Sequence, residues 1–403
     1  MSKDNISGFF EKFLKKEPLF KNKVVLQSNY APESIPHREK EINQVAQIIA
    51  PCLKLEKPSN LFVYGKTGTG KTLIVKHTTK EILGVAKRQD IPISVLYLNC
   101  KLKKVADTEY RLIAEMARKL GRDIPSTGLP TEEVYRLFYD VLDKEKMLLI
   151  LVLDEIDQLL KKSGDEILYN LTRINEDLKN SMITIIGISN DLIFVDNLDP
   201  RVKSSLSEEE IIFPPYNALQ IQSILSERVK KAFRGGVLEQ GLVEKCSAYA
   251  AREHGDARRA LELLRVSGEI AERENMLKVN INHLDKAEEK IERDRIQDIV
   301  CSQPKQFQAT LFSILSLTKE RNENILTGEV YEIYKKICSE IKLRPLTQRR
   351  ISDVIAELDM LGIITAKVKS QGRYGRTREI SMSIPSHTRG KMDKVLAEGL
   401  GLA

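Results

Sequence analysis

Residues 61–72 read LFVYGKTGTGKT, a short apolar run followed from Gly65 to Thr72 by the pattern G-x-x-x-x-G-K-[ST]. The run is too short for a helix and is typical of a buried strand, and helical periodicity follows it. Between a strand and a helix this pattern forms a phosphate-binding loop, because its backbone N–H groups point inward and the helix N-terminus adds partial positive charge. The stretch therefore predicts that the chain binds ATP or GTP.

The residues of this loop have separate expected roles. Lys71 should reach the β- and γ-phosphates, and the Thr72 hydroxyl should ligate Mg²⁺. A glycine-rich turn with a chance lysine is the alternative, and the strand and helix on either side weigh against it. The expected nucleotide contacts here are Gly65, Thr67, Gly68, Thr69, Gly70, Lys71, Thr72 and Leu73.

Two carboxylates follow a second apolar run. Residues 148–153 are all aliphatic, and Asp154 and Glu155 come directly after them. A buried parallel strand presents such residues at its carboxyl end, where α/β sheets bind their ligands. We expect Asp154 to hold Mg²⁺ through water and Glu155 to orient or activate the attacking water. An Asp-Glu pair is a weak signal alone, and the phosphate-binding loop upstream makes the functional interpretation the better one.

Short apolar runs alternate with helical periods in the first half of the chain. Such alternation predicts an α/β domain with a parallel sheet and helices on both faces. Pro214 and Pro215 cannot continue a ladder, so a domain boundary is expected there, and residues 217–298 show only helical periods. The strand candidates are residues 61–64, 95–99, 148–154, 184–189 and 211–213.

The last quarter of the chain has a different order of elements. Three helical stretches precede an apolar strand, a glycine-rich turn and a second strand, which is the order of a winged helix-turn-helix. Residues 301–403 contain 17 Lys and Arg against 11 Asp and Glu, and the whole chain has a net charge of +7. This asymmetry favours contact with a polyanion, and a solvated surface is the alternative. The stretches are residues 307–319, 327–342, 347–361, 363–368 and 377–383.

The composition fits a soluble protein of several domains. Its 403 residues are 42% hydrophobic and 30% charged. No membrane-spanning run, signal peptide or CxxC pair is present, so we expect a cytoplasmic protein with buried, reduced thiols. The expected domains are an N-terminal tail (1–20), a nucleotide-binding core (21–215), a small helical domain (216–298), a winged helix (299–390) and a C-terminal tail (391–403).

Three further polar residues could act on a nucleotide. Asn190 follows a strand candidate and could position a hydrolytic water, although a polar loop residue is an equal alternative. Arg201 could act on a neighbouring subunit's γ-phosphate, although spacing alone favours a surface arginine. Arg258 lies in the first turn of a helix that Asp256 is expected to cap, where a cation opposes the helix dipole and hints at an anionic ligand.

These segments together resemble a known family. GKTGTGKT, LVLDEID, ISND, LDPRVKSSL, FPPYN and EHGDARRALELLR are similar to segments of the archaeal replication initiators related to origin recognition complex subunit 1 and cell division control protein 6. LTQRRISDVIAELDMLGIITAKVKSQGRYGRTREI is similar to their winged-helix domain. The resemblance runs from about Tyr30 to about Ile384 and implies an AAA+ P-loop sheet, a helical lid and a C-terminal winged helix.

The resemblance also implies residue roles and partners. It assigns Asn190 to sensor 1, Arg201 to an arginine finger and Arg258 to sensor 2, in a slow ATPase that retains ADP and acts as a switch. The expected partners are double-stranded origin DNA, the replicative minichromosome-maintenance helicase and paralogous initiators on adjacent sites, with no membrane, in a nucleoid-associated protein. The remaining implied nucleotide contacts are His37 and Arg38, from the segment before the P-loop, and Tyr216.

The third helix of the winged helix is expected to enter the major groove of DNA, with its N-terminal residues at the base edges. Arginine can pair with guanine and glutamine with adenine, and whether these side chains read bases or grip phosphates is open. The basic, glycine-flanked hairpin that follows suits the minor groove. The expected contacts are Thr347, Gln348, Arg349, Arg350 and Ser352 on the helix, and Lys369, Arg373, Tyr374 and Arg376 on the wing.

A second DNA contact is expected from the nucleotide-binding core. Two helical stretches, 107–120 and 131–144, lie between consecutive strand candidates, although one helix is enough for such a crossover. The extra helix and its loop match the initiator-specific insertion of the family, which contacts DNA. Ser126, Thr127 and Gly128 could donate to phosphates through hydroxyls and backbone N–H groups.

Three functions remain as alternatives at this point. The first is an ATP-switched origin-binding protein that helps to recruit or load the replicative helicase. The second is an ATP-sensing DNA-binding transcriptional regulator, which would not need the composite site that Arg201 implies. The third is a clamp-loader-type ATPase, and the terminal winged helix argues against it.

Overall fold

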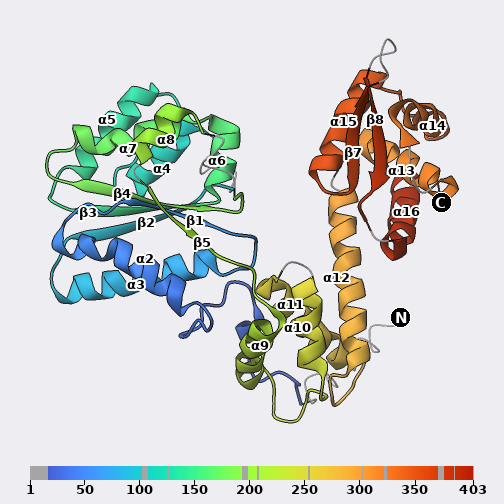
Figure 1. Cartoon of the computed structure of the whole chain (residues 1–403), viewed down its shortest axis with the longest axis horizontal. Coiled ribbons are helices and arrows are strands. Elements are labelled where there is room, and N and C mark those ends of the chain that lie inside the picture. Colours follow the sequence, from blue (N-terminus) through green and yellow to red (C-terminus); the bar gives the residue numbers. More distant parts are fainter. Residues whose placement is uncertain are drawn as a thin grey trace, which may run out of the picture. The chain divides into compact units, whose positions relative to one another are not determined.

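The structure is a computed structural model that describes residues 17–101, 108–125, 127–192, 198–206, 208–252, 255–301, 303–321, 325–370, 376–384 and 386–402. The chain forms two compact units, residues 1–284 and 285–403. The division falls within the long helix α12 (Ile281–Cys301). The first unit holds the nucleotide-binding core and the helical domain together, and the second holds the winged helix (Figure 1).

A five-stranded parallel sheet forms the centre of the first unit. Its strand order is β2-β3-β4-β1-β5, so all five predicted strands are present. The edge strand β5 begins three residues earlier than predicted, because its first residues, Glu208–Glu210, are acidic and give no apolar signal. The strands are β1 (Asn60–Tyr64), β2 (Ile93–Asn99), β3 (Leu148–Asp154), β4 (Met182–Ser189) and β5 (Glu208–Ile212).

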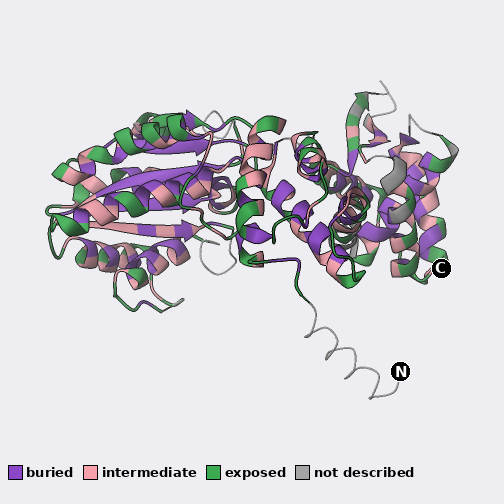
Figure 2. Cartoon of the chain, turned by 90° about the horizontal axis from the view of Figure 1, so that it is seen from below, coloured by how far each residue is buried: buried purple, intermediate pink, exposed green. Residues whose placement is uncertain are grey.

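Helices cover both faces of this sheet, as predicted (Figure 1). Side chains alternate between the faces along each strand. In β1, Leu61 and Val63 join a core with α2 and α3, whereas Phe62 and Tyr64 join a core with the helices of the other face. The inner strands β1, β3 and β4 are buried along nearly all of their length, whereas the edge strands β2 and β5 are partly exposed (Figure 2). The helices are α2 (Glu39–Ile49) and α3 (Lys71–Arg88) on one face, and α4 (Glu109–Lys119), α5 (Thr131–Leu142), α6 (Ile156–Ser163), α7 (Glu166–Asp177) and α8 (Pro200–Leu206) on the other.

The helical domain consists of α9 (Ala218–Ala232), α10 (Leu242–Arg252), α11 (Ala257–Arg273) and the start of α12. Asn217 and Gln220 form a capping box at the start of α9, which satisfies backbone N–H groups that the helix leaves free. Asp256 caps α11 as predicted, by accepting hydrogen bonds from the backbone N–H groups of Arg258 and Arg259.

The predicted N-terminal tail is wrong at its last residues. Leu19 and Phe20 are buried, and Phe20 forms a β-bridge with Phe233 at the end of α9. The two rings lie 4.6 Å apart between centroids. A Cβ at Gly268 in α11 would fall 2.4 Å from Phe20, so the ring needs a glycine beneath it. Leu19 and Phe20 lie outside any stretch with helical periodicity, so the sequence contains no pattern that predicts their burial.

The second unit has the predicted winged-helix order. Its elements are α13 (Lys305–Glu320), β6 (Ile325–Leu326), α14 (Thr327–Glu340), α15 (Gln348–Met360), β7 (Ile364–Ser370), β8 (Arg376–Met382) and α16 (Ser386–Leu400). The strands form an antiparallel sheet in the order β6-β8-β7. The Thr347 side chain caps α15, and Ile351, Ile355 and Leu358 of this helix are buried.

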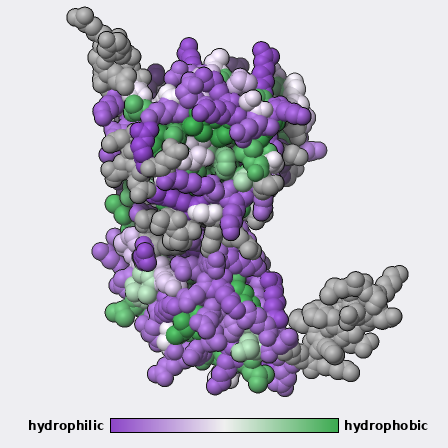
Figure 3. Space-filling model, turned by 90° about the vertical axis from the view of Figure 1, so that its right-hand side faces the viewer, coloured by the Kyte–Doolittle hydropathy of each residue, from purple (hydrophilic) through white to green (hydrophobic). Residues whose placement is uncertain are grey.

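The prediction of a C-terminal tail over residues 391–403 is also wrong. Residues 386–400 form α16, and Met392, Leu396 and Leu400 are buried in the winged-helix core. Their spacing of four residues puts them on one face of the helix. Glycines and lysines between them hide this period in the sequence. On the face that Figure 3 shows, hydrophilic side chains predominate among the described residues. No described helix is both long and apolar enough to cross a membrane.

Candidate functional site

The P-loop lies between β1 and α3, and it brings Lys71 to Asn190. The Lys71 ammonium donates to the backbone oxygens of Gly65 at 2.6 Å and Lys66 at 2.8 Å, and to Asn190 Oδ1 at 2.9 Å. Burial, and to a smaller extent the positive charge of Arg258, lowers the pKa of Lys71 to about 8. The predicted P-loop lysine, sensor 1 and sensor 2 residues thus share one electrostatic environment, although they come from distant parts of the sequence.

The carboxyl end of β3 places the two acids as predicted. Asp154 is 5% exposed, and the Thr72 hydroxyl donates to its two oxygens at 3.2 and 3.1 Å. The phenol of Tyr97 also donates to this carboxylate. Glu155 has a left-handed backbone with φ of 56°, an uncommon conformation for a residue with a side chain. Its carboxylate lies 3.8 Å from the Lys101 ammonium.

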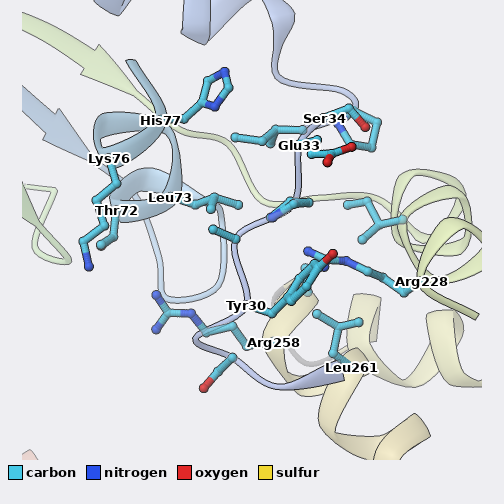
Figure 4. A pocket seen from close by; sticks show the side chains of 18 of the residues that line it. Tyr30, Glu33, Ser34, Thr72, Leu73, Lys76, His77, Arg228, Arg258 and Leu261 are labelled. Carbon is cyan, nitrogen blue, oxygen red and sulfur yellow. The ribbon is translucent and has the colours of Figure 1, made fainter. Parts of the chain in front are cut away.

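A cavity of about 500 Å³ opens beside the P-loop. Its walls come from residues 27–36, the first turns of α3, Tyr216, α9 and α11. Tyr30 from the N-terminal segment, and Arg228, Arg258 and Leu261 from the helical domain, line it (Figure 4). Apolar walls around a few charged groups are typical of a small-molecule site. Residues 27–35 were not predicted to belong to the site, because they form an irregular segment that contains no motif.

Arg38, predicted to contact the nucleotide, is buried and holds the P-loop. It is 2% exposed, and its guanidinium donates to Thr69 O at 3.1 Å, to Glu41 Oε1 at 2.9 Å and to Pro214 O. Its Cζ also lies 4.1 Å from the centre of the Tyr216 ring. Protein oxygens thus satisfy the guanidinium, and Arg38 is not among the residues that line the cavity. Its contact with the nucleotide stays a prediction.

His37, Thr67 and Thr69 were also predicted to contact the nucleotide, and they are not among the residues that line the cavity. His37 has φ of 63°, and its Nε2 is buried without a hydrogen-bond partner among the described residues. Thr69 is buried and donates to Lys66 O at 2.8 Å, which closes the loop on itself. Thr67 is exposed. Gly68, Gly70, Thr72, Leu73 and Tyr216 do line the cavity.

The cap of α11 touches the P-loop at Gly68. Gly68 has φ of +73°, and a Cβ there would fall 1.7 Å from Asp256 Oδ1. The same Asp256 oxygen accepts from the Arg258 backbone N–H at 2.8 Å. One carboxylate therefore caps the start of α11 and also packs against the P-loop. Arg258 leaves this turn toward the first turn of α3 (Figure 4).

Arg201 lies apart from this cavity. It is in the first turn of α8, its side chain is 82% exposed, and its guanidinium pairs with Asp199 at 3.2 Å. Hydrogen bonding to Asp199 raises the pKa of Arg201 and lowers that of Asp199. An exposed pair of this kind is weak, so the guanidinium is available to another molecule.

The predicted DNA-contacting loop of the core is anchored at its start. Ile124 is buried, and Pro125 O accepts a hydrogen bond of 2.8 Å from the Tyr110 hydroxyl. Thr127 and Gly128 are exposed, and Ser126 lies outside the described residues. Both predicted helices, α4 and α5, are present. The crossover from β3 to β4 also contains two helices, α6 and α7, so a second helix alone does not mark an insertion.

The winged helix exposes the predicted basic residues of α15. Gln348, Arg349 and Arg350 are exposed at its N-terminus, and Arg350 lies 3.4 Å from Asp353. The Ser352 hydroxyl is directed back to Gln348 O at 3.1 Å. In the wing, Lys369 lies 3.6 Å from Glu379 on the opposite strand. Arg373 and Tyr374 lie outside the described residues, as does the side chain of Arg376.

Comparison with known proteins places the chain in a family. The family models described as "CDC6, C terminal winged helix domain", "Cdc6 AAA+ ATPase-type lid domain" and "AAA domain" match residues 298–389, 222–289 and 55–192. The ORC1-type DNA replication protein of Pyrococcus abyssi is 52% identical over 94% of this chain and 91% of its own length. The chain belongs to the ORC1-type DNA replication proteins. The ORC1-type DNA replication protein 1 of Methanosarcina mazei is 50% identical over 94% of this chain and 92% of its own.

A solved structure supports the same assignment for this ORC1-type chain. The Aeropyrum pernix ORC1 protein, solved in complex with DNA, matches 95% of this chain and 98% of its own with 43% identity and a TM-score of 0.83. The resemblance stated from the motifs is thereby confirmed, as is the predicted fold of AAA+ sheet, helical lid and winged helix. The ORC1-type chain is a DNA replication protein of the AAA+ ATPase family.

Proposed function

We propose that this ORC1-type protein is an ATP-switched initiator that binds duplex origin DNA and helps to recruit or load the replicative minichromosome-maintenance helicase. The observation that carries the proposal is its similarity over 95% of the chain to an ORC1 protein in complex with DNA. The proposed location is the cytoplasm, at the nucleoid, and the proposed neighbours on adjacent sites are paralogous initiators.

The proposed ligand of the cavity is ATP or ADP. Its phosphates would meet the N–H groups of the P-loop, Lys71 and the N-terminus of α3. Its base would meet the apolar wall that includes Tyr30, Leu73 and Leu261. Structures of the related Aeropyrum pernix ORC2 protein are described as ADP and ADPNP–ADP forms, which supports this choice for the fold.

Magnesium fits the oxygen donors at the end of β3. A threonine hydroxyl and one carboxylate are the set that Mg²⁺ uses when substrate phosphates supply further ligands, so Thr72 and Asp154 would hold it. Bound there, the ion would neutralise charge on the phosphates. Glu155 would orient the attacking water, Asn190 would hold it near Lys71, and Arg258 would contact phosphate from the lid. Hydrolysis by one copy alone would be slow, because Arg201 would have to come from a neighbouring copy to stabilise the transition state.

The proposed DNA contacts lie in both units of the chain. The exposed N-terminus of α15 and the basic β7–β8 hairpin would enter the grooves, as in other winged helices. Thr127 and Gly128 would contact phosphates from the core. We propose the roles of Ser126, Arg373, Tyr374 and Arg376 from the sequence alone.

Binding of the full chain to a labelled duplex from the chromosomal replication origin tests the proposal. Fluorescence anisotropy should give tighter binding to this duplex than to a shuffled duplex of the same composition, at physiological salt. Deletion of residues 124–130 should lower origin affinity and the bend angle of the duplex. Equal affinity for the two duplexes, at every salt concentration, would contradict origin recognition.

A further inference from the structure

We propose that Tyr97 is a positioning residue for Asp154, and that it orients this carboxylate for Mg²⁺ through the hydrogen bond that its phenol donates. The inference rests on the proposed nucleotide site, and it concerns a residue that neither the motifs nor the family models single out. Tyr97 would not touch the nucleotide or the reacting atoms. It would act only through Asp154.

The sheet brings Tyr97 to this carboxylate. In the parallel pairing of β2 with β3, Asn99 is opposite Asp154, and Tyr97 is two residues earlier on the same strand. Residues two apart on a strand share a face of the sheet, and a phenol is long enough to reach a diagonal neighbour. The Tyr97 hydroxyl accordingly donates to Asp154 Oδ2.

Three donors fix the orientation of the Asp154 carboxylate. The Thr72 hydroxyl lies 3.2 and 3.1 Å from its two oxygens, and the backbone N–H of Glu155 lies 3.1 Å from Oδ1. Thr72 is itself an expected magnesium ligand, so its hydroxyl oxygen would coordinate the ion when the ion binds. The Tyr97 phenol would take no part in the coordination. It can therefore hold the carboxylate in the same orientation with or without the ion.

The phenol is suited to a permanent donor role. A tyrosine hydroxyl carries its proton at physiological pH and is therefore a hydrogen-bond donor. A protonated phenol beside a carboxylate can only donate to it, which removes ambiguity about the direction of the bond.

Two helices hold Tyr97, one through its ring and one through its backbone oxygen. The Lys76 ammonium lies 4.1 Å from the centre of the Tyr97 ring, and the Lys119 ammonium donates to Tyr97 O at 2.8 Å. Lys76 is one helical turn beyond Thr72 in α3, so the helix that carries the phosphate-binding residues also packs on the ring. A cation over a ring face is attracted by the ring quadrupole. The Tyr97 hydroxyl is thus held by the same helix that carries Thr72.

Removal of such a supporting partner is expected to weaken metal binding. Groups that hydrogen-bond to a metal ligand typically contribute roughly 10- to 100-fold in metal affinity. Tyr97→Phe keeps the ring and the cation–ring contact and removes only the hydroxyl. The expected effect is therefore a loss of the Mg²⁺ contribution to nucleotide binding, with little effect on the nucleotide alone.

The test compares ADP binding with Mg²⁺ and with EDTA, by isothermal titration calorimetry on the full chain. For Tyr97→Phe the ratio of the two affinities should fall by roughly tenfold or more, and Mn²⁺ binding to the ADP complex, followed by electron paramagnetic resonance, should weaken equally. The matched control is Tyr135→Phe, which loses a phenol–carboxylate hydrogen bond of 2.6 Å to Glu109 in the same unit. Its ratio should equal that of the wild type.

Two results would overturn the proposal. In the first, the ratio for Tyr97→Phe equals that of the wild type. In the second, both affinities fall by the same factor, which indicates a general structural role. Thermal melting of both variants guards against unfolding as the cause. If the wild-type chain binds no ADP under either condition, the proposed nucleotide site itself fails, and this inference fails with it.

Discussion

Replacement of Gly268 by alanine should destabilise the protein, although alanine is the better helix former. A Cβ at Gly268 in α11 would fall 2.4 Å from Phe20 Cζ and 2.9 Å from Phe233 Cε1. Both rings are buried, with 8% and 3% exposure. Since each covers the other, neither ring can move aside without exposing apolar surface.

The expected magnitude follows from two opposing effects. An extra carbon in a well-packed core costs about 1–3 kcal/mol. Glycine to alanine in a helix gains about 1 kcal/mol. The net loss for Gly268→Ala should therefore lie between about 0 and 2 kcal/mol. In a Phe20→Ala background the main obstacle is gone, Phe233 has room to shift, and the same substitution should stabilise by about 1 kcal/mol.

The assay is a double-mutant cycle on the full chain. Urea denaturation of the four proteins, followed by far-ultraviolet circular dichroism because the chain has no tryptophan, gives each free energy of unfolding. A coupling energy of roughly 1–3 kcal/mol and a change of sign are predicted. If Gly268→Ala has the same effect in both backgrounds to within about 0.5 kcal/mol, the packing of Phe20 on α11 described above is incorrect.

Three further predictions concern the nucleotide and DNA surfaces. Asp256→Ala should cost about 1 kcal/mol through loss of the α11 cap and should accelerate ADP release, as measured by hydrogen exchange of α11 and stopped-flow fluorescence. Lys71→Ala should abolish nucleotide binding in calorimetry and leave most of the DNA affinity, because the winged helix is a separate unit. Arg349→Ala should weaken DNA binding in anisotropy and lower the slope of log affinity against log salt by about 0.9 for one lost phosphate contact.

Each of these predictions has a result that contradicts it. For Asp256→Ala it is unchanged protection of the α11 amides together with unchanged ADP release. For Lys71→Ala it is a loss of DNA affinity as large as that of Arg349→Ala, since the two units would then not act separately. For Arg349→Ala it is an unchanged salt dependence of DNA binding.

The parts of the fold that a sequence pattern encodes were predicted well. The P-loop, the five strands and the helix order of the winged helix all depend on local signals, namely glycine spacing and apolar periodicity. Residues 148–154 are a clear case, because a strand buried on both faces has no polar position to interrupt its pattern. The edge strand β5 has acidic residues where the buried strands have apolar ones, so its bounds were misplaced.

The features that could not be predicted from the sequence depend on contacts between distant segments of the chain. Tyr97 is an ordinary strand tyrosine until the register of β2 with β3 places it near Asp154. Arg38 sits in a segment that the resemblance assigns to the nucleotide, yet its three acceptors come from three separate parts of the chain. The burial of Phe20 could not be predicted, because Phe20 packs against Phe233, at the end of α9, and Gly268 in α11, which are more than 200 residues away.

The central claim is that the nucleotide-binding unit and the winged helix act together where chromosome replication begins. A genome-wide map of the sites that the native protein occupies in the cell, compared with the positions where DNA synthesis starts, tests this claim most directly. We predict that the strongest binding sites coincide with the start positions. Binding sites spread over promoters, with no enrichment where synthesis starts, would contradict the claim and favour a transcriptional regulator.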